Sequence, residues 1–209
     1  AKLTSAVAFL AFGVLVYVMI EAMASVQGRR PVGTTSEVSN MWGSDFWTRE
    51  LAFREDTFCG LYCGACDVFQ ANKRGTVEEL AHACEMQPLQ LVCHGCKTST
   101  NSVYCVDCDI KACATAKDLE YCFQCADYPC ARLVAFRNDD APHHSAVLHN
   151  LDRMRAQGLA RWLAEQRARW SCPHCGMEFT WYDRTCTACG AALYNCEAEE
   201  RDLAGEDRL

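Results

Sequence analysis

"CPHCGMEFTWYDRTCTACG", residues 172–190, contains the most regular cysteine pattern of the chain. Its cysteines follow the spacing Cys-x2-Cys-x10-Cys-x2-Cys, and Gly176 and Gly190 each follow one pair. A turn that aims two thiolates at one ion needs a residue that tolerates positive φ at this point. The aromatic side chains between the pairs are typical of a small β-hairpin. The pattern therefore predicts a zinc ribbon with a closed structural site, made by Cys172, Cys175, Cys186 and Cys189. One iron in the same four sulfurs is the alternative that the spacing leaves open.

Cysteine usage along the rest of the chain also indicates metal binding. The chain has 209 residues and 17 cysteines, and many of these occur in pairs separated by two residues. Such pairs are typical of metal knuckles, whereas a secreted disulfide framework favours scattered spacings. We expect the upstream ligands to be Cys59, Cys63, Cys66, Cys93, Cys96, Cys105, Cys108, Cys113, Cys122, Cys125 and Cys130. Two or three four-ligand sites are possible, and the sequence does not show which pairs share an ion.

Three further residues keep an open role. Cys84 lies on the apolar face of a helix predicted after Thr76, which favours a small core residue. If three upstream sites are filled, Cys84 or His94 must contribute a ligand. Cys196 is interpreted as a spare thiol.

The first three cysteines, in CGLYCGAC (residues 59–66), have the spacing that radical-SAM enzymes use for a catalytic iron–sulfur cluster. Such a barrel needs roughly 200 residues of strand–helix repeats, whereas the chain after Cys66 is crowded with knuckles. A thioredoxin-like dithiol needs a βαβ context, which is also missing. The histidines lie at knuckles, as His174 does, or cluster at His143, His144 and His149, where solvation is the simpler interpretation. We therefore expect closed metal sites and no enzyme.

The order of the knuckles resembles a known family. CGLYCGAC, CHGC, YCVDCDIKACA and CFQCADYPC, followed by a helix that runs to RWSCPHCG, resemble a family of uncharacterised prokaryotic cysteine-rich proteins. It is catalogued as a domain of unknown function, number three thousand seven hundred and ninety-five. The resemblance runs from about Cys59 to Gly190. It implies a metal-binding fold, presumed to hold zinc through the upstream cysteines named above, and no known reaction. Cys84 has no counterpart in the family pattern.

The net charge and the hydropathy of the chain limit the classes of partner that we expect. The formal net charge of −7 argues against nucleic acid, because phosphate binding needs a basic face. Residues 3–26 are apolar enough for a membrane span, since about 20 residues at 1.5 Å each cover roughly 30 Å. A secretory signal peptide ending near Ala22-Met23-Ala24 and a buried core helix are the alternatives. Two arginines after the segment against one lysine before it place the cysteine-rich part on the cytoplasmic side.

These observations predict a small metal-stapled α+β fold. We expect a single transmembrane anchor at 1–27, a linker at 28–50, a cysteine-rich domain at 51–137, a linking amphipathic helix at 143–170, a zinc ribbon at 171–196 and an acidic tail, solvated and disordered, at 197–209.

Two functions fit this organisation. The first is a membrane-anchored, multi-zinc structural or interaction protein, an accessory subunit of a membrane complex whose partners are the membrane and other protein subunits. The second is an iron–sulfur electron carrier associated with a membrane complex. The two-residue knuckles favour Zn²⁺, whereas the Cys59, Cys63 and Cys66 triplet favours iron–sulfur.

Overall fold

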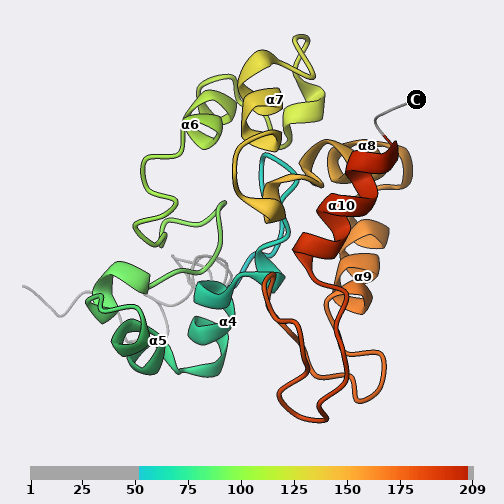
Figure 1. Cartoon of the computed structure of the whole chain (residues 1–209). Coiled ribbons are helices and arrows are strands. Elements are labelled where there is room, and N and C mark those ends of the chain that lie inside the picture. The colour runs from blue at the N-terminus through green and yellow to red at the C-terminus, as the bar shows by residue number, and fades with distance from the viewer. Residues whose placement is uncertain (1–51, 207–209) are drawn as a thin grey trace, which may run out of the picture. The chain divides into compact units, whose positions relative to one another are not determined.

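The structure, a computed structural model, describes residues 52–206, and residues 1–51 and 207–209 lie outside this description. The described part consists of short helices joined by loops (Figure 1). Its α-helices are α4 (Asp67–Arg74), α5 (Val77–Ala83), α6 (Asp109–Ala116), α7 (Ala131–Arg137), α8 (Val147–Gln157), α9 (Leu159–Arg169) and α10 (Cys196–Glu206). Short turns of 3-10 helix occur at η1 (Cys63–Ala65), η2 (Pro88–Leu91), η3 (Cys122–Gln124) and η4 (Pro142–His144).

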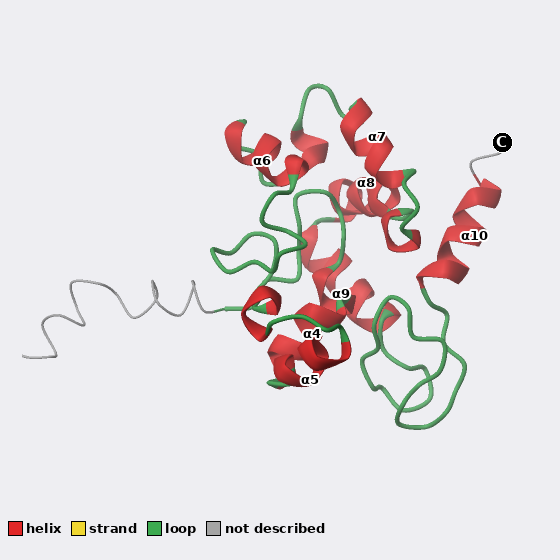
Figure 2. Cartoon of the chain, turned by 60° about the vertical axis from the view of Figure 1, so that its left-hand side comes forward, coloured by secondary structure: helices red, strands yellow, loops and turns green. Residues whose placement is uncertain are grey.

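The predicted α+β fold is wrong for the described residues, which form a helical structure. Figure 2 shows helices and loops, and β pairing within residues 52–206 is limited to the isolated bridges Asp56–Tyr62, Ser171–Glu178 and Thr185–Ala192. The aromatic segment of the expected hairpin explains the difference. The backbone N–H of Trp181 donates to the carbonyl of Ala65 at 2.9 Å, and not to a facing strand. The segment therefore packs on the cysteine-rich domain and does not extend a sheet.

The prediction of a single-pass membrane protein with a cytoplasmic cysteine-rich part is also corrected. Across residues 52–206, no helix is both long enough and apolar enough to cross a membrane. The segment 1–27, on which the prediction rested, and the linker 28–50 both lie outside the described residues.

Three helices begin directly after a cysteine. Cys66, Cys108 and Cys130 are the N-cap residues of α4, α6 and α7, and none of them caps its helix through a side-chain hydrogen bond. Sulfur is a weak acceptor, so cysteine gains little at this position from capping itself. Helix capping therefore does not explain why cysteines stand at these three starts.

The predicted linking helix at 143–170 is interrupted, because Gly158 separates α8 from α9. Gly158 has φ 84° and ψ 157°, a combination that is essentially restricted to glycine. The two helices then pack on each other through Asn150, whose side-chain oxygen accepts hydrogen bonds from Trp162 at 3.3 Å and Gln166 at 3.4 Å.

One apolar core joins the beginning and the end of the described chain. The apolar face of the predicted linking helix at 143–170 lies in this core through Leu151, Met154, Trp162 and Trp170. The buried members of the core are Cys59, Tyr62, Ala65, Ile110, Tyr121, Leu133, Val147, Leu151, Met154, Trp162, Trp170, Phe179 and Cys196. A smaller cluster of Val68, Ala81, Leu91 and Cys93 lies beneath α4 and α5.

Cys84 is exposed, so its interpretation as a core residue is wrong. Cys196 is fully buried and helps to fill the main core.

The acidic tail is largely helical, which corrects the prediction of disorder for 197–206. Its carboxylates have partners on the preceding segments: Glu197 binds Arg184 at 2.9 Å, and Glu199 lies 3.6 Å from Arg169. The Tyr194 hydroxyl donates to Asp202 at 2.6 Å. These contacts anchor α10 beside the residues that precede it.

Candidate metal centre

The two cysteine pairs of residues 172–190 adopt the same turn. In the first, the Gly176 N–H donates to the Cys172 carbonyl and the Cys172 N–H donates to Met177, both at 2.8 Å. In the second, Gly190 donates to Cys186, and Cys186 donates to Ala191, again at 2.8 Å. The two glycines have φ of 74° and 75°, as the sequence predicts for this turn. Each pair is therefore a preformed knuckle.

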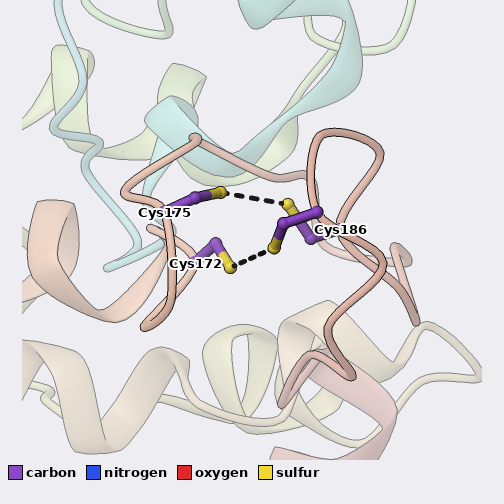
Figure 3. A group of neighbouring side chains, drawn as sticks. Cys172, Cys175 and Cys186 are labelled. Atoms are coloured by element: carbon purple, nitrogen blue, oxygen red, sulfur yellow. Dashed lines mark hydrogen bonds between the residues drawn. The ribbon is translucent and has the colours of Figure 1, made fainter.

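The two knuckles bring four sulfur atoms together. The Sγ atoms of Cys172, Cys175, Cys186 and Cys189 all lie within 4.8 Å of one another. The Cys172–Cys189 and Cys175–Cys186 sulfurs are 3.6 Å and 3.5 Å apart. Zinc–sulfur bonds of about 2.3 Å in a tetrahedron give sulfur–sulfur edges of about 3.8 Å. Figure 3 shows the sulfur atoms of Cys172, Cys175 and Cys186 directed toward a common centre. The four thiols therefore fit a single metal ion, and this geometry suits zinc and iron alike.

Hydrogen bonds shift the pKa values of the ribbon thiols in opposite directions. The backbone N–H groups of Cys189 and Ala188 lower the pKa of Cys186 to about 7. The Met177 amide lowers the pKa of Cys175, but hydrogen bonding with Cys186 and Cys189 outweighs this and raises it to about 12. Metal ligation requires thiolates, so a bound cation would displace the protons of those thiols that are still protonated. Cys175 and Cys189 are exposed, so the site is accessible from solvent.

The upstream cysteines are arranged more loosely. Within residues 52–206, the four cysteines of residues 172–189, called the ribbon cysteines, are the cysteine, histidine or acidic side chains that gather in a group of three or more with all ligand atoms within 4.8 Å of one another. Cys63 is half-buried. Desolvation of its thiol, followed by the charges of Cys66, Cys96 and Cys93, raises its pKa well above the usual value. These four cysteines come from the η1 knuckle and from CHGC.

Further thiols continue from this first group. Burial raises the pKa of Cys96 to about 12, with Cys59, Cys105 and Cys108 as its other thiol neighbours. Burial likewise raises the pKa of Cys59 to about 11, with Cys108 and Cys122 nearby. The remaining predicted ligands, Cys113, Cys122, Cys125 and Cys130, line one cavity near α6 and α7. Their role as metal ligands, like that of the other upstream cysteines, stays a prediction.

A buried ion pair holds the cysteine-bearing loops in place. Lys97 donates to Asp56 at 2.9 Å, and their side chains are 5% and 6% exposed. The Tyr121 hydroxyl donates to the same carboxylate at 2.9 Å. Burial raises the pKa of Asp56, but the hydrogen bond and charge of Lys97 outweigh burial and leave this pKa below its usual value. Burial also lowers the pKa of Lys97, yet the short contact favours an ionised pair. The pair fixes the segments that carry Cys59, Cys96 and Cys122.

A buried amide joins the first knuckle to the ribbon. Gln70 is 2% exposed. Its side-chain nitrogen donates to the carbonyl of Gly64 at 2.9 Å and to that of Phe179 at 3.0 Å. Gly64 lies between Cys63 and Cys66, and Phe179 lies between the ribbon knuckles. The sequence offered no signal for this bridge or for the Asp56–Lys97 pair, because both join residues far apart in the chain.

The histidines differ in their outcomes. His149 and His174 are exposed, as expected. His143 is partly buried: its ring stacks on Trp181 at 4.1 Å, and its Nδ1 lies 2.7 Å from the Tyr182 hydroxyl. His143 therefore packs against the segment between the ribbon knuckles.

The fold and the site define a helical, cysteine-rich protein with a four-thiol site that could hold a metal ion. Residues 56–135 match the model of the family described as "Protein of unknown function (DUF3795)". The match is narrower than the resemblance drawn from the sequence: it ends within α7, so the ribbon lies outside it. No curated protein matches the chain, and neither does any solved structure.

Proposed function

We propose that this protein is a structural and interaction module in which one Zn²⁺ ion fixes the ribbon onto the cysteine-rich domain. The observation that carries the proposal is the convergence of the four ribbon sulfurs within 4.8 Å. Four thiolates complete the coordination shell that zinc prefers and leave no position for a catalytic water. The role of such an ion is to stabilise the fold.

The contacts of the ribbon support this role. Its segment between the knuckles supplies Phe179 to the main core, where the ring lies 5.4 Å from that of Trp170. The Phe179 carbonyl accepts from Gln70, and the Glu178 carbonyl accepts from Arg74 at 3.2 Å. A structural zinc ion contributes on the order of 10 kcal/mol of folding free energy. The ion would therefore stabilise a surface of the cysteine-rich domain as well as the ribbon.

An exposed apolar surface favours another protein subunit as the partner. Leu89, Tyr104 and Val106 are 83%, 65% and 55% exposed. The Val103 N–H donates to Gln90 at 2.9 Å and the Tyr104 hydroxyl contacts the Met86 sulfur at 3.2 Å, so the two segments lie together. Contiguous exposed apolar side chains are typical of protein interaction sites. The net charge of −7 favours a protein over a nucleic acid.

The test is the metal content and protease resistance of Cys175→Ser. This variant leaves three thiolates, so we expect it to lose the ribbon ion and to be cut by protease within residues 171–196. Cys84→Ser is the matched control, because Cys84 is an exposed thiol outside the ribbon. Full metal content with an intact ribbon in Cys175→Ser would refute the proposal.

The same purified protein separates zinc from iron. Zinc thiolates are colourless, whereas iron–thiolate centres absorb visible light. Iron in stoichiometric amount, with colour that is lost in Cys175→Ser, would replace the structural role with electron transfer.

A further inference from the structure

A second group of thiols lines a small cavity formed by α6, η3 and α7. Cys113 lies on α6, Cys122 begins η3, Cys125 is the C-cap of η3 and Cys130 is the N-cap of α7. All four line one cavity of about 40 Å³, whose other walls include Ile110 and Leu133. A single water needs only roughly 10–15 Å³ of such volume. The cavity therefore has room for one ion among the four sulfurs.

Cys122 links the other three thiols of the group. Burial raises its pKa, and the charges of Cys130, Cys113 and Cys125 add to this effect, each more strongly than that of Cys108. Cys108 itself belongs with the other upstream group, since it neighbours Cys59, Cys96 and Cys105. This arrangement favours a division of the upstream cysteines between Cys108 and Cys113, with Cys122 also in reach of Cys59 and Cys108.

The backbone around Cys122 repeats that of the first knuckle. The Cys125 N–H donates to the Cys122 carbonyl at 3.1 Å, just as the Cys66 N–H donates to the Cys63 carbonyl at 2.9 Å. The two helices that supply the outer ligands are tied together, because Arg132 on α7 donates to the carbonyl of Asp109 on α6 at 3.2 Å. These contacts hold the backbone segments that carry the four cysteines. No three of the four sulfurs lie within 4.8 Å of one another, so a shared ion requires the side chains to move closer.

Positive charge stands beside the thiols. The Lys117 ammonium lies 3.2 Å from the Cys125 sulfur and 3.0 Å from Asp127. Arg132 also lines the cavity. Four thiolates around a divalent ion leave a net charge of about −2. Lys117 and Arg132 offset this charge in part, since Asp127 also pairs with Lys117, and hydrogen bonds to ligand sulfurs stabilise the thiolate form.

We propose that Cys113, Cys122, Cys125 and Cys130 form a second four-thiolate centre for one divalent cation, Zn²⁺ by its preference for thiolates, which closes α6 and α7 onto η3. The centre goes beyond the proposed function, because its ligands and its cavity are separate from those of the ribbon. Binding displaces the thiol protons to solvent and changes no oxidation state.

The first test counts bound zinc by native mass spectrometry of the full chain. Cys113→Ser and Cys130→Ser should each lose one ion, and the double variant should lose no more than either single variant, because both residues hold the same ion. Combined with Cys175→Ser, either variant should lose two. Cys84→Ser should keep the wild-type count. Full zinc content in Cys113→Ser, or loss of two ions in the Cys113→Ser/Cys130→Ser double variant, would overturn the proposal.

The second test uses the wild-type chain and so does not depend on how the variants fold. The zinc-loaded protein is treated with increasing chelator and alkylated with iodoacetamide, and the modified thiols are located by peptide mass spectrometry. The four cysteines should be protected together and become reactive in one step, while exposed Cys84 reacts throughout. Separate release of Cys113 from Cys122 and Cys125 would refute a shared ion. Alkylation of Cys172, Cys175, Cys186 and Cys189 reports separately on metal loss from the ribbon, so failure of the proposed function is distinguished from failure of this second centre.

Discussion

His143 occupies a site that disfavours its protonation. Burial and the neighbouring His144 lower its pKa from 6.5 to about 4, and Asp139 offsets only part of this effect. The ring is held between Trp181 and the Tyr182 hydroxyl, so protonation would place a charge where access to water is restricted. Because the folded-state pKa lies below the unfolded one, neutral His143 favours the fold above about pH 6.5. This contribution is lost as the pH falls toward 4.

We therefore expect His143→Gln to flatten the dependence of unfolding free energy on pH between 6.5 and 4. Chemical unfolding at a series of pH values, at a fixed zinc concentration, measures this slope. Acid release of metal affects both proteins, so the difference between them isolates the histidine. His149→Gln, at an exposed position of α8, is the control and should retain the wild-type slope. An unchanged slope in His143→Gln would rule out the effect.

At the scale of single residues, the sequence identified the four clustered cysteines of the ribbon because all four lie within one short segment. Cys172 to Cys189 spans two knuckles whose turns are local, and the glycine after each pair marks the turn. The upstream ligand sets could not be divided in the same way. Cys63 meets Cys93 and Cys96 only after the intervening α4 and α5 have folded, and that packing leaves no trace in the spacing of the cysteines.

Gly158 is the residue on which the arrangement of α8 and α9 depends. Its dihedral angles lie where side chains are strained, although no atom lies within 4 Å of the position of an added Cβ. Gly158→Ala should therefore lower the free energy of unfolding by about 1–3 kcal/mol through backbone strain alone. Urea unfolding at a fixed zinc concentration measures the change.

Gly75→Ala is the matched control for this helix break. Gly75 also has open space around it, but its φ of 72° and ψ of 28° place it in the ordinary left-handed region. We expect a smaller loss, about 1 kcal/mol. Equal losses at the two positions would show that the unusual ψ of Gly158 is not the cause.

At the scale of elements, three expectations failed for reasons that involve partners distant in sequence. The helix over 143–170 had the right apolar face, but Gly158 breaks it so that Trp162 can reach Asn150. The ribbon strands are reduced to bridges because Trp181 bonds to Ala65. The acidic tail becomes α10 because Arg184 and Arg169 form ion pairs with its carboxylates. The composition of a segment does not indicate any of these contacts between residues that are distant in sequence.

Gln70 connects the two cysteine-bearing parts of the molecule. Its amide nitrogen satisfies two buried carbonyls, and leaving a buried polar group without a partner costs about 1–3 kcal/mol. Gln70→Leu should therefore lower the free energy of unfolding by about 2–5 kcal/mol, while the zinc count stays unchanged. Glu78→Leu, at an exposed position of α5, should change it by less than about 1 kcal/mol. If Gln70→Leu were as stable as wild type, the bridge would contribute nothing to the joining of the two parts.

The bridge made by Gln70 also has a consequence for synthesis. Gln70 and Phe179 are 109 positions apart, and Phe179 lies in the last part of the core to leave the ribosome. At about 5–20 residues per second, on the order of ten seconds separate the appearance of the first knuckle from that of its final neighbour. During that interval the nascent chain presents the thiols of the first knuckle without the residues that later cover them. The order of translation thus determines which cysteines first encounter metal or oxidant in the cell.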